Sequence, residues 1–487
     1  GRILMLEPRR LAARAAAERM AATLGQEVGQ TVGYRVRGAS AIGKNTRIEV
    51  VTEGILTRML QGDPDLPGVG AVIFDEFHER SLNADLGLAL CLEVAGALRD
   101  DLLLVAMSAT LDAAPVAELM QAQIVTSEGR SFPVEPRWLS RPIGKERFEN
   151  AVSDLVLTAL AEAKGSALVF LPGEGEIRRV ESLLAAQVPA GCTIAPLFGA
   201  MDFKAQRAAI RPAQNGRKVV LATSIAETSL TIEGITIVVD GGRARRARFD
   251  AASGMSRLVT EKVTRAEATQ RAGRAGRVSE GVAYKLWTKG EEGALAAYPP
   301  AEIEAGDLTG FALELALWGA QADELAFVTP PHDGRLVEAQ NVLRMLEALD
   351  AQGRITAHGR ALARLPLHPR LAHMVAKGGR LAPTLAALLA ERDPLRGAGV
   401  DLSLRMAAIR GQGGAAQAHA PTLARIRQEA KRLAKGQDGH GSDDIGVLAA
   451  LAYPDRVGLR RKGDAPRYVL SGGKGAVMPQ GDAMAGE

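Results

Sequence analysis

Side chains able to hold a metal ion and activate water occur in the tetrapeptide Asp75-Glu76-Phe77-His78, which directly follows the apolar run 69–74. A carboxylate at the carboxyl end of a parallel strand lies where an open α/β sheet presents ligand-binding groups. Asp75 could hold Mg²⁺ there, directly or through its waters, and Glu76 could orient and deprotonate an attacking water. Taken alone, such a tetrapeptide also fits a solvated acidic loop after a strand.

A second segment, 270–277, has the sequence QRAGRAGR. Arg274 and Arg277 are three residues apart, so on a helix they would share a face. Guanidinium groups suit phosphate oxygens and the charge that builds up in phosphoryl transfer, and the small Gly and Ala residues permit close approach. Taken alone, the segment also fits a basic surface helix.

Two further segments are rich in hydroxyls. Ser108-Ala109-Thr110 follows the apolar run 101–107, where its hydroxyls could hydrogen-bond to the acidic loop and couple it to a second lobe. Residues 222–230, ATSIAETSL, begin at the end of the expected strand 217–222. Hydroxyls and backbone N–H groups at a strand-to-helix turn can cradle phosphates of a nucleotide or a polynucleotide. They can equally cap the following helix.

Alternating strands and helices must position these segments. Short apolar runs alternate with helical patterns, which predicts parallel sheets covered by helices. In the first third we expect strands at 1–6, 69–74 and 101–107 and a helix at 8–24. A Pro-containing stretch, 130–143, is interpreted as a linker. Beyond it we expect helices at 147–163, 174–187 and 202–211 and strands at 167–171, 192–196, 217–222 and 235–240. Two such units predict two lobes with a cleft.

The second half of the chain and its composition further restrict the possible fold, number of domains and location. From about residue 306 the sequence predicts mainly helices, with a final β-like segment at 466–477. The chain has 487 residues, 47% of them hydrophobic, so several domains are expected. Cys91 and Cys192 lie far apart without CxxC pairing, which argues against a disulfide framework or a cysteine zinc site and fits a reducing, cytoplasmic location. No apolar run has membrane-spanning length.

Positive charge is concentrated in one region. Lys and Arg number 60 against 56 Asp and Glu in the whole chain, a net charge of +4. Residues 241–277 alone hold ten basic and three acidic residues. This excess favours contact with phosphates, although a solvated basic face would have the same composition.

The segments together resemble a known family. Their order, with EPRRLAARAAAERMA at 7–21 and VTEGILTRML at 51–60, resembles the successive motifs of superfamily-two DEAH-box RNA helicases. DEFH in place of DEAH, followed by Glu79-Arg80-Ser81, and RLPLHPRLAHM at 364–374 resemble the bacterial HrpB-type helicases most closely. The resemblance runs across essentially the whole chain. It implies an ATP-dependent RNA helicase with ATP and Mg²⁺ as cofactors and single-stranded nucleic acid, RNA above all, as partner.

The resemblance also implies an α/β fold with two RecA-like parallel-sheet lobes of the P-loop NTPase fold, the first incomplete, followed by winged-helix and helical-bundle domains. The expected domains are a truncated first RecA-like lobe, 1–139; a second RecA-like lobe, 140–305; a winged-helix domain, 306–360; a ratchet-like helical bundle, 361–450; and the start of an OB-like module, 451–487.

Roles follow from the resemblance at matching positions. Asp75 holds Mg²⁺, Glu76 activates water and His78 makes the contact between the lobes. Gln270 positions the attacking water or the γ-phosphate, and Arg274 and Arg277 are arginine fingers. These six residues form the nucleotide-binding set. Hydroxyls that couple hydrolysis to lobe movement belong to Ser108 and Thr110. Residues that grip the nucleic-acid backbone without reading bases are Arg9, Arg10, Thr52, Glu53, Gly54, Thr223, Arg245 and Arg246.

One family feature has no match. The P-loop holds phosphates through its glycine-rich turn and lysine. Gly38–Asn45 has the GxxxxGK spacing, but Asn45 replaces the Ser or Thr that ligates Mg²⁺, no buried strand leads into it, and it follows the PRR motif. Lys44 is therefore interpreted as a surface or RNA-contacting residue.

Two functions stay open from the sequence. One is an ATP-dependent RNA helicase, of which this chain would be an N-terminally truncated central portion, cut at both ends, that hardly hydrolyses ATP. The alternative is a non-catalytic nucleic-acid-binding fragment that lacks the phosphate cradle. DNA in place of RNA is a third possibility, because backbone gripping does not detect the 2′-hydroxyl.

Overall fold

The computed structural model describes residues 1–109, 113–127, 129, 132–213, 215–227, 232–250, 255–395, 397–414, 417–437 and 439–486. The chain divides into two compact units. The first comprises Gly1–Asp250, Met255–Gly306 and Leu325–Pro330, and the second comprises, within the described residues, Asp307–Glu324 and 331–486. Each unit is described by itself. None of the helices in the described ranges is long and apolar enough to cross a membrane.

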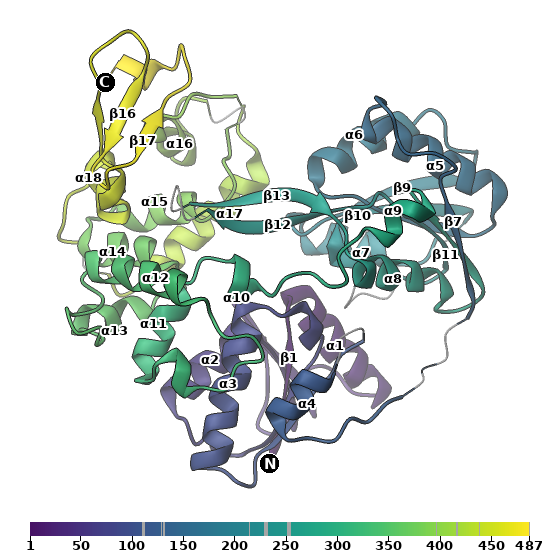
Figure 1. The fold of residues 1–487 in the computed structure, drawn as a ribbon, viewed down its shortest axis with the longest axis horizontal. Helices are drawn as coiled ribbons and strands as arrows, with labels where there is room; N and C mark the ends of the chain where they lie inside the picture. Colours follow the sequence, from purple (N-terminus) through teal and green to yellow (C-terminus); the bar gives the residue numbers. More distant parts are fainter. Residues whose placement is uncertain are drawn as a thin grey trace. The chain divides into compact units, whose positions relative to one another are not determined.

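The first sheet of unit one has six strands in the order β3-β2-β4-β1-β5-β6. Its strand β1 is labelled in Figure 1. All neighbours are parallel except β2 and β3. The strands are β1 (Arg2–Glu7), β2 (Val32–Val36), β3 (Ala39–Ala41), β4 (Ile48–Thr52), β5 (Val69–Phe74) and β6 (Leu103–Ala106). The helices of this part are α1 (Arg10–Thr23), α2 (Glu53–Gly62), α3 (Leu82–Ala97) and α4 (Ala114–Met120). The strands expected near 1–6, 69–74 and 101–107 and the helix expected at 8–24 are confirmed.

Small side chains let the first helix pack closely on this sheet. Ala13, Ala17 and Ala21 of α1 are fully buried against Val32 and Val50 of the sheet. These alanines recur at every fourth position, which is the spacing of one helix face. The close packing fixes the start of α1, where the Arg9-Arg10 pair lies.

The second sheet is entirely parallel, in the order β7-β14-β11-β8-β10-β9. Its strands are β7 (Val134–Trp138), β8 (Ser166–Phe170), β9 (Cys192–Leu197), β10 (Arg217–Ala222), β11 (Ile235–Asp240) and β14 (Gly281–Lys285). The accompanying helices are α5 (Phe148–Glu162), α6 (Glu174–Leu184), α7 (Phe203–Ile210), α8 (Arg265–Gly273), α9 (Lys289–Gly293) and α10 (Glu302–Ala305). The second predicted α/β lobe is confirmed.

The interpretation of 130–143 as a linker is wrong at its centre. Residues 134–138 form β7, which pairs with β14. Pro136 lowers the strand signal, yet the structure tolerates it because β7 is the edge strand, where a missing backbone donor costs little. The second sheet therefore begins before residue 140, so the expected boundary between 139 and 140 cuts β7 away from its own sheet.

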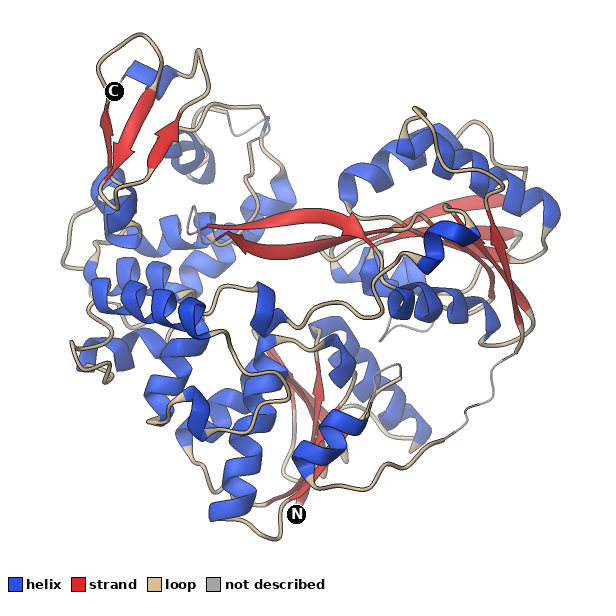
Figure 2. Cartoon of the chain, in the orientation of Figure 1, coloured by secondary structure: helices blue, strands red, loops and turns tan. Residues whose placement is uncertain are grey.

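A two-stranded antiparallel ribbon extends from the second sheet (Figure 2). It consists of β12 (Arg243–Asp250) and β13 (Met255–Lys262), with Arg243 opposite Lys262. Gly241 and Gly242 connect β11 to the ribbon. Gly242 has a φ of +70°, and a Cβ there would lie 2.8 Å from the Trp287 ring. The ribbon therefore leaves the sheet through a turn that requires glycine.

Unit two is mainly helical, as predicted. Its helices are α11 (Thr309–Trp318), α12 (Asp333–Met345), α13 (Ala357–Ala363), α14 (Pro369–Lys377), α15 (Ala382–Leu389), α16 (Leu402–Ile409), α17 (Ala420–Leu433) and α18 (Ile445–Ala452). An antiparallel bridge between Leu349 and Ile355 lies between α12 and α13. The expected β-like end forms a three-stranded antiparallel sheet of β15 (Gly458–Arg460), β16 (Arg467–Leu470) and β17 (Gly475–Val477).

Candidate functional site

The backbone holds the acidic loop rigidly at the end of β5. Phe77 donates its N–H to the Met107 carbonyl over 3.0 Å, which ties the loop to the end of β6. Glu76 and Arg80 have φ values of +51° and +46°. This left-handed region is uncommon for residues other than glycine and is often found at functional sites. The Glu76 N–H donates to the Asp75 carboxylate over 2.8 Å, so the two carboxylates are fixed relative to each other.

Crowded carboxylates make this loop an electrostatically unfavourable place without a cation. Burial first, and then Asp75 and Glu79, raise the pKa of Glu76 to about 7. Burial and Asp75 raise the pKa of Glu7 to about 9. Glu7, the last residue of β1, is 4% exposed and was not among the predicted site residues. Its position beside the PRR motif was the only available signal. Oxygen-rich surroundings of this kind suit Mg²⁺, which typically takes one or two carboxylates and completes its shell with water and phosphate oxygens.

The arginines come from the end of α8. This helix begins with a capping box in which Thr264 and Glu267 satisfy each other's backbone N–H groups. It ends at Gly273, so Arg274 begins the 3-10 turn η3 (Arg274–Gly276) and Arg277 follows that turn. The expectation that Arg274 and Arg277 share an α-helical face is therefore corrected: their three-residue spacing spans a 3-10 turn, in which such residues also align.

Arg274 is held by the chain and faces the acidic loop. Its Nε donates to the Glu227 carbonyl over 2.8 Å. Burial and Arg277 lower the pKa of Arg274 to about 9, whereas Glu76 opposes this decrease. Burial also lowers the pKa of Arg277, again against the effect of Glu76. Both arginines therefore interact electrostatically with the carboxylate on the first lobe.

A direct contact joins the lobes beside these charges. The Nε2 atoms of His78 and Gln270 are 2.9 Å apart. Burial lowers the pKa of His78, so its neutral ring can accept a hydrogen bond from the Gln270 amide. His78 Nε2 also lies 3.5 Å from a carboxylate oxygen of Glu76. The structure thus brings together four predicted residues, Glu76, His78, Gln270 and Arg274.

Predicted nucleic-acid contacts differ in how freely their side chains are presented. Arg9 donates to the Ser224 carbonyl over 2.8 Å and forms an ion pair of 3.2 Å with Glu79. Arg10, at the first position of α1, is exposed. Thr223 is half-buried at the start of η2 (Ser224–Ala226).

The junction of β4 and α2 holds three more of these predicted contacts. Thr52 is half-buried and Gly54 is exposed, with open space where a Cβ would project. Glu53 is buried and accepts a 2.5 Å hydrogen bond from Ser81. Burial raises the pKa of Glu53 to about 7, against the effect of this bond. Glu53 thus lies inside the lobe, while Gly54 lies at its surface.

The ribbon's arginines are partly neutralised. Arg246 pairs with Glu261 over 3.2 Å and with Glu267 over 2.5 Å. Arg248 pairs with Glu261 over 2.7 Å. Arg245 has the more exposed side chain, 35% against 15% for Arg246, and lies 3.3 Å from Glu176. Arg245 is therefore better placed than Arg246 to meet an external phosphate.

Two remaining predictions concern the hydroxyl pair and the near-match to a P-loop. Ser108 is exposed after β6, and Thr110 lies outside the described residues, so their coupling role stays a prediction. Gly38–Asn45 spans the edge strand β3 and an exposed loop that leads to β4. The expectation that no buried strand leads into this segment is wrong, because β2 is buried and ends at Val36. A strand rather than a helix follows the segment, however, so its rejection as a phosphate-binding loop stands.

A cavity of about 490 Å³ adjoins the contact between the lobes. Its lining includes Arg9, His78, Ser224, Arg245 and Gln270. Predicted residues of the nucleotide set and of the nucleic-acid set thus line one partly open pocket.

Two parallel-sheet lobes that set carboxylates against arginines are the arrangement expected from the resemblance to helicases. Residues 149–279 match the family model "Helicase conserved C-terminal domain", and residues 339–367 match "Helicase associated domain (HA2), winged-helix". The chain is a homologue of the HrpB-type DEAH-box helicases along its whole length. It is 46% identical over 491 residues to ATP-dependent RNA helicase HrpB of Escherichia coli (strain K12), and the match covers 99% of this chain and 59% of that relative.

Other comparisons agree. ATP-dependent RNA helicase HrpA of Escherichia coli (strain K12) is 34% identical over 406 residues, covering 80% of this chain and 31% of the relative. The crystal structure of the E. coli DExH-box NTPase HrpB matches with a TM-score of 0.83 and 46% identity, covering all of this chain and 60% of the other. A second structure, of the Escherichia coli DEAH/RHA helicase HrpB, matches with a TM-score of 0.86 and 44% identity, covering all of this chain and 61% of the other. The chain thus spans about three fifths of the length of these HrpB relatives, and the predicted resemblance to HrpB-type helicases and the predicted fold class are confirmed.

Proposed function

We propose that the protein to which this sequence belongs is an ATP-dependent RNA helicase, an NTP hydrolase that unwinds or remodels nucleic acid. One observation carries the proposal: the 2.9 Å contact between His78 and Gln270 sets the acidic loop of the first lobe against the arginine segment of the second. In agreement with it, burial raises the pKa of Glu76, and Arg274 and Arg277 oppose this increase. The names of its relatives, ATP-dependent RNA helicases, support the same function.

The described residues fit ATP and Mg²⁺ by their chemistry. Bound Mg²⁺ would neutralise phosphate charge, and Asp75 would hold it. Glu76 has a pKa of about 7, so near neutral pH it can take a proton from water, as general-base catalysis requires. Arg274 and Arg277 would bind the phosphate oxygens, while Gln270 would orient the water.

A single strand of nucleic acid is the proposed partner. Arg9, Arg10, Gly54, Thr223 and Arg245 lie at or near the surface, and backbone N–H groups and arginines there would grip phosphates independently of sequence. RNA rather than DNA is proposed from the names of the relatives. Both cysteines are free, which is compatible with the cytoplasmic location we propose.

A second function is favoured for residues 1–487 on their own. Lys44 projects from an exposed loop between two strands, so the only GxxxxGK spacing noted in the chain does not precede a helix. A chain that binds phosphates through arginines alone would hold single-stranded RNA and hydrolyse ATP poorly. This is the non-catalytic nucleic-acid-binding alternative.

Measuring RNA binding and RNA-stimulated ATP hydrolysis on this chain tests both functions. The informative variant is Glu76→Gln, with Glu27→Gln as the matched control because Glu27 is exposed. Turnover that Glu76→Gln abolishes and Glu27→Gln preserves would support a complete motor in this chain. RNA binding without turnover would support the alternative for the chain alone. Failure to bind single-stranded RNA or DNA would refute both functions.

A further inference from the structure

Arg271, beside the predicted motor residues, is buried to an unusual degree. It lies in α8 and is 1% exposed, the largest of the fully buried side chains in the described part of the chain. Its Nε donates to the Glu227 carboxylate over 3.0 Å, and its Nη1 donates to the Asp240 carboxylate over 3.0 Å and to the Arg243 carbonyl over 3.3 Å. One side chain therefore joins the end of β11, the start of β12 and the turn after η2.

Stability alone does not account for this arrangement. Charges removed from water lose hydration, and a buried ion pair can often be replaced by neutral residues of similar volume without loss of stability. Burial raises the pKa of Glu227 to about 7 even though Arg271 opposes the increase. The group is thus costly to bury. What it does provide is a fixed geometry, because Arg271 offers several donors in one rigid plane.

One end of this network holds the nucleotide-side arginine. The backbone carbonyl of Glu227 accepts from Arg274 Nε over 2.8 Å, while the Glu227 side chain is anchored on Arg271. Arg274 therefore takes its position from a residue whose own position depends on Arg271.

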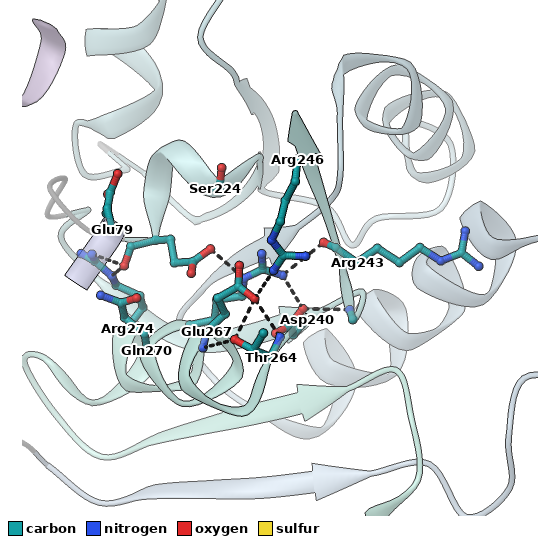
Figure 3. A network of polar contacts seen from close by, with 12 residues as sticks. Glu79, Ser224, Asp240, Arg243, Arg246, Thr264, Glu267, Gln270 and Arg274 are labelled. Carbon is teal, nitrogen blue, oxygen red and sulfur yellow. Dashed lines mark hydrogen bonds and ion pairs between the residues drawn. The ribbon is translucent and has the colours of Figure 1, made fainter. Parts of the chain in front are cut away.

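The other end holds the root of the ribbon (Figure 3). Asp240 accepts both from Arg271 and from the Gly242 N–H, the latter over 2.8 Å. Arg271 also binds the carbonyl of Arg243, the first residue of β12. At the start of the same helix, Glu267 pairs with Arg246 of the ribbon. Helix α8 is thus attached to the ribbon at both of its ends.

We propose that Arg271 is a positioning residue that couples the β12–β13 ribbon to Arg274. Through Glu227 and Asp240 it holds the ribbon root and the Arg274 guanidinium in one frame, so that nucleic acid bound along the ribbon orders the arginine side of the nucleotide site. This inference rests on the proposed function and adds to it the route by which RNA acts on that site.

The test separates positioning from stability. Arg271→Met leaves two buried carboxylates without their cation, so the informative variant is the neutral triple Arg271→Met/Glu227→Gln/Asp240→Asn. It preserves side-chain volume and removes all three charges. Arg265→Met is the matched control, because Arg265 lies on the same helix and is exposed. Hydrogen exchange is measured by mass spectrometry on the 487-residue chain, with and without a short oligouridylate, after unfolding temperatures have been compared.

In the wild type and in Arg265→Met, RNA is expected to slow exchange in the ribbon and also in segments 224–227 and 265–277. In the triple variant the unfolding temperature recovers relative to Arg271→Met, and RNA still slows exchange in the ribbon, but protection of 224–227 and 265–277 is lost. Equal protection of those segments in the triple variant would overturn the proposal. Ribbon-only protection in the wild type would overturn it too, while leaving RNA binding intact.

Two further outcomes of the exchange experiment also decide the proposal. Absence of any RNA effect in the wild type would refute RNA binding itself and the coupling with it. Where the triple variant does not fold, Arg271→Lys replaces it, since this change keeps the positive charge and removes the planar donors that reach both carboxylates. Weakened protection of 265–277 in Arg271→Lys supports the proposal, and unchanged protection overturns it.

Discussion

The buried carboxyl of Glu227 leads to a quantitative prediction about stability and pH. Burial raises its pKa from 4.5 to about 7 in the folded protein. A carboxyl with a raised folded pKa stabilises the folded state at pH values below its unfolded pKa, and this contribution is lost as the pH rises toward the folded pKa. The difference corresponds to roughly 3 kcal/mol of unfolding free energy, lost between about pH 4.5 and pH 7.

Glu227→Gln removes this dependence, because the amide is neutral at every pH and still offers an oxygen to Arg271. The unfolding free energy of the variant, relative to wild type, is therefore expected to rise by about 3 kcal/mol between pH 4.5 and pH 8. Urea unfolding followed by tryptophan fluorescence measures it. Trp138 and Trp287 report on the second sheet, and Trp318→Phe removes the signal of unit two.

Glu233→Gln is the control, since Glu233 is an exposed carboxylate in the same lobe. Its unfolding free energy should follow that of wild type at each pH. The reasoning would be refuted by parallel pH profiles for Glu227→Gln and wild type, because the folded-state carboxyl would then titrate as it does in the unfolded chain.

Three other predictions concern Arg277, the two ribbon arginines Arg245 and Arg246, and Gly242. In a form of the protein that hydrolyses ATP, Arg277→Gln should lower RNA-stimulated turnover by about 10³-fold with little change in RNA affinity, measured by steady-state kinetics and fluorescence anisotropy. Arg245→Ala should reduce the slope of log affinity for RNA against log salt concentration by about 1. Arg246→Ala should change this slope less, because Glu261 and Glu267 neutralise Arg246. A larger change of slope for Arg246→Ala than for Arg245→Ala would contradict this prediction. Gly242→Ala should destabilise the second lobe by about 1 kcal/mol or more, visible as a lower unfolding temperature, because its φ of +70° and the nearby Trp287 ring oppose a Cβ.

The strands that can be predicted from the sequence are those whose pattern lies within a short stretch of residues. Strands β5, β10 and β11 can be predicted because each contains consecutive apolar residues, which are typical of a strand buried on both faces. Strand β7 was missed because its neighbour in the sheet, β14, is far along the chain and Pro136 hides the pattern. Pairing across such distances has no signature within a short window.

The same limit applies to the site. Glu76, Gln270 and Arg274 could be selected by residue type and spacing within short motifs. Arg271 lies in the same motif as Arg274, yet its role depends on Glu227, which is 44 residues away, and on Asp240, which is 31 residues away. Motif spacing shows that several arginines are present; only the fold shows that one faces inward and the others face the acidic loop.

The left-handed backbone at Glu76 and Arg80 has a consequence for attempts to make the protein more robust. Each such residue costs the folded state on the order of 1–3 kcal/mol, a cost that glycine would not incur. At position 80 glycine would also remove the bidentate ion pair between Arg80 and the buried Asp85, so selection for heat resistance alone would favour glycine only at position 76. At position 76 it would do so by discarding the carboxylate proposed to activate water, so that thermal hardiness and turnover would be opposing selective pressures on a single residue.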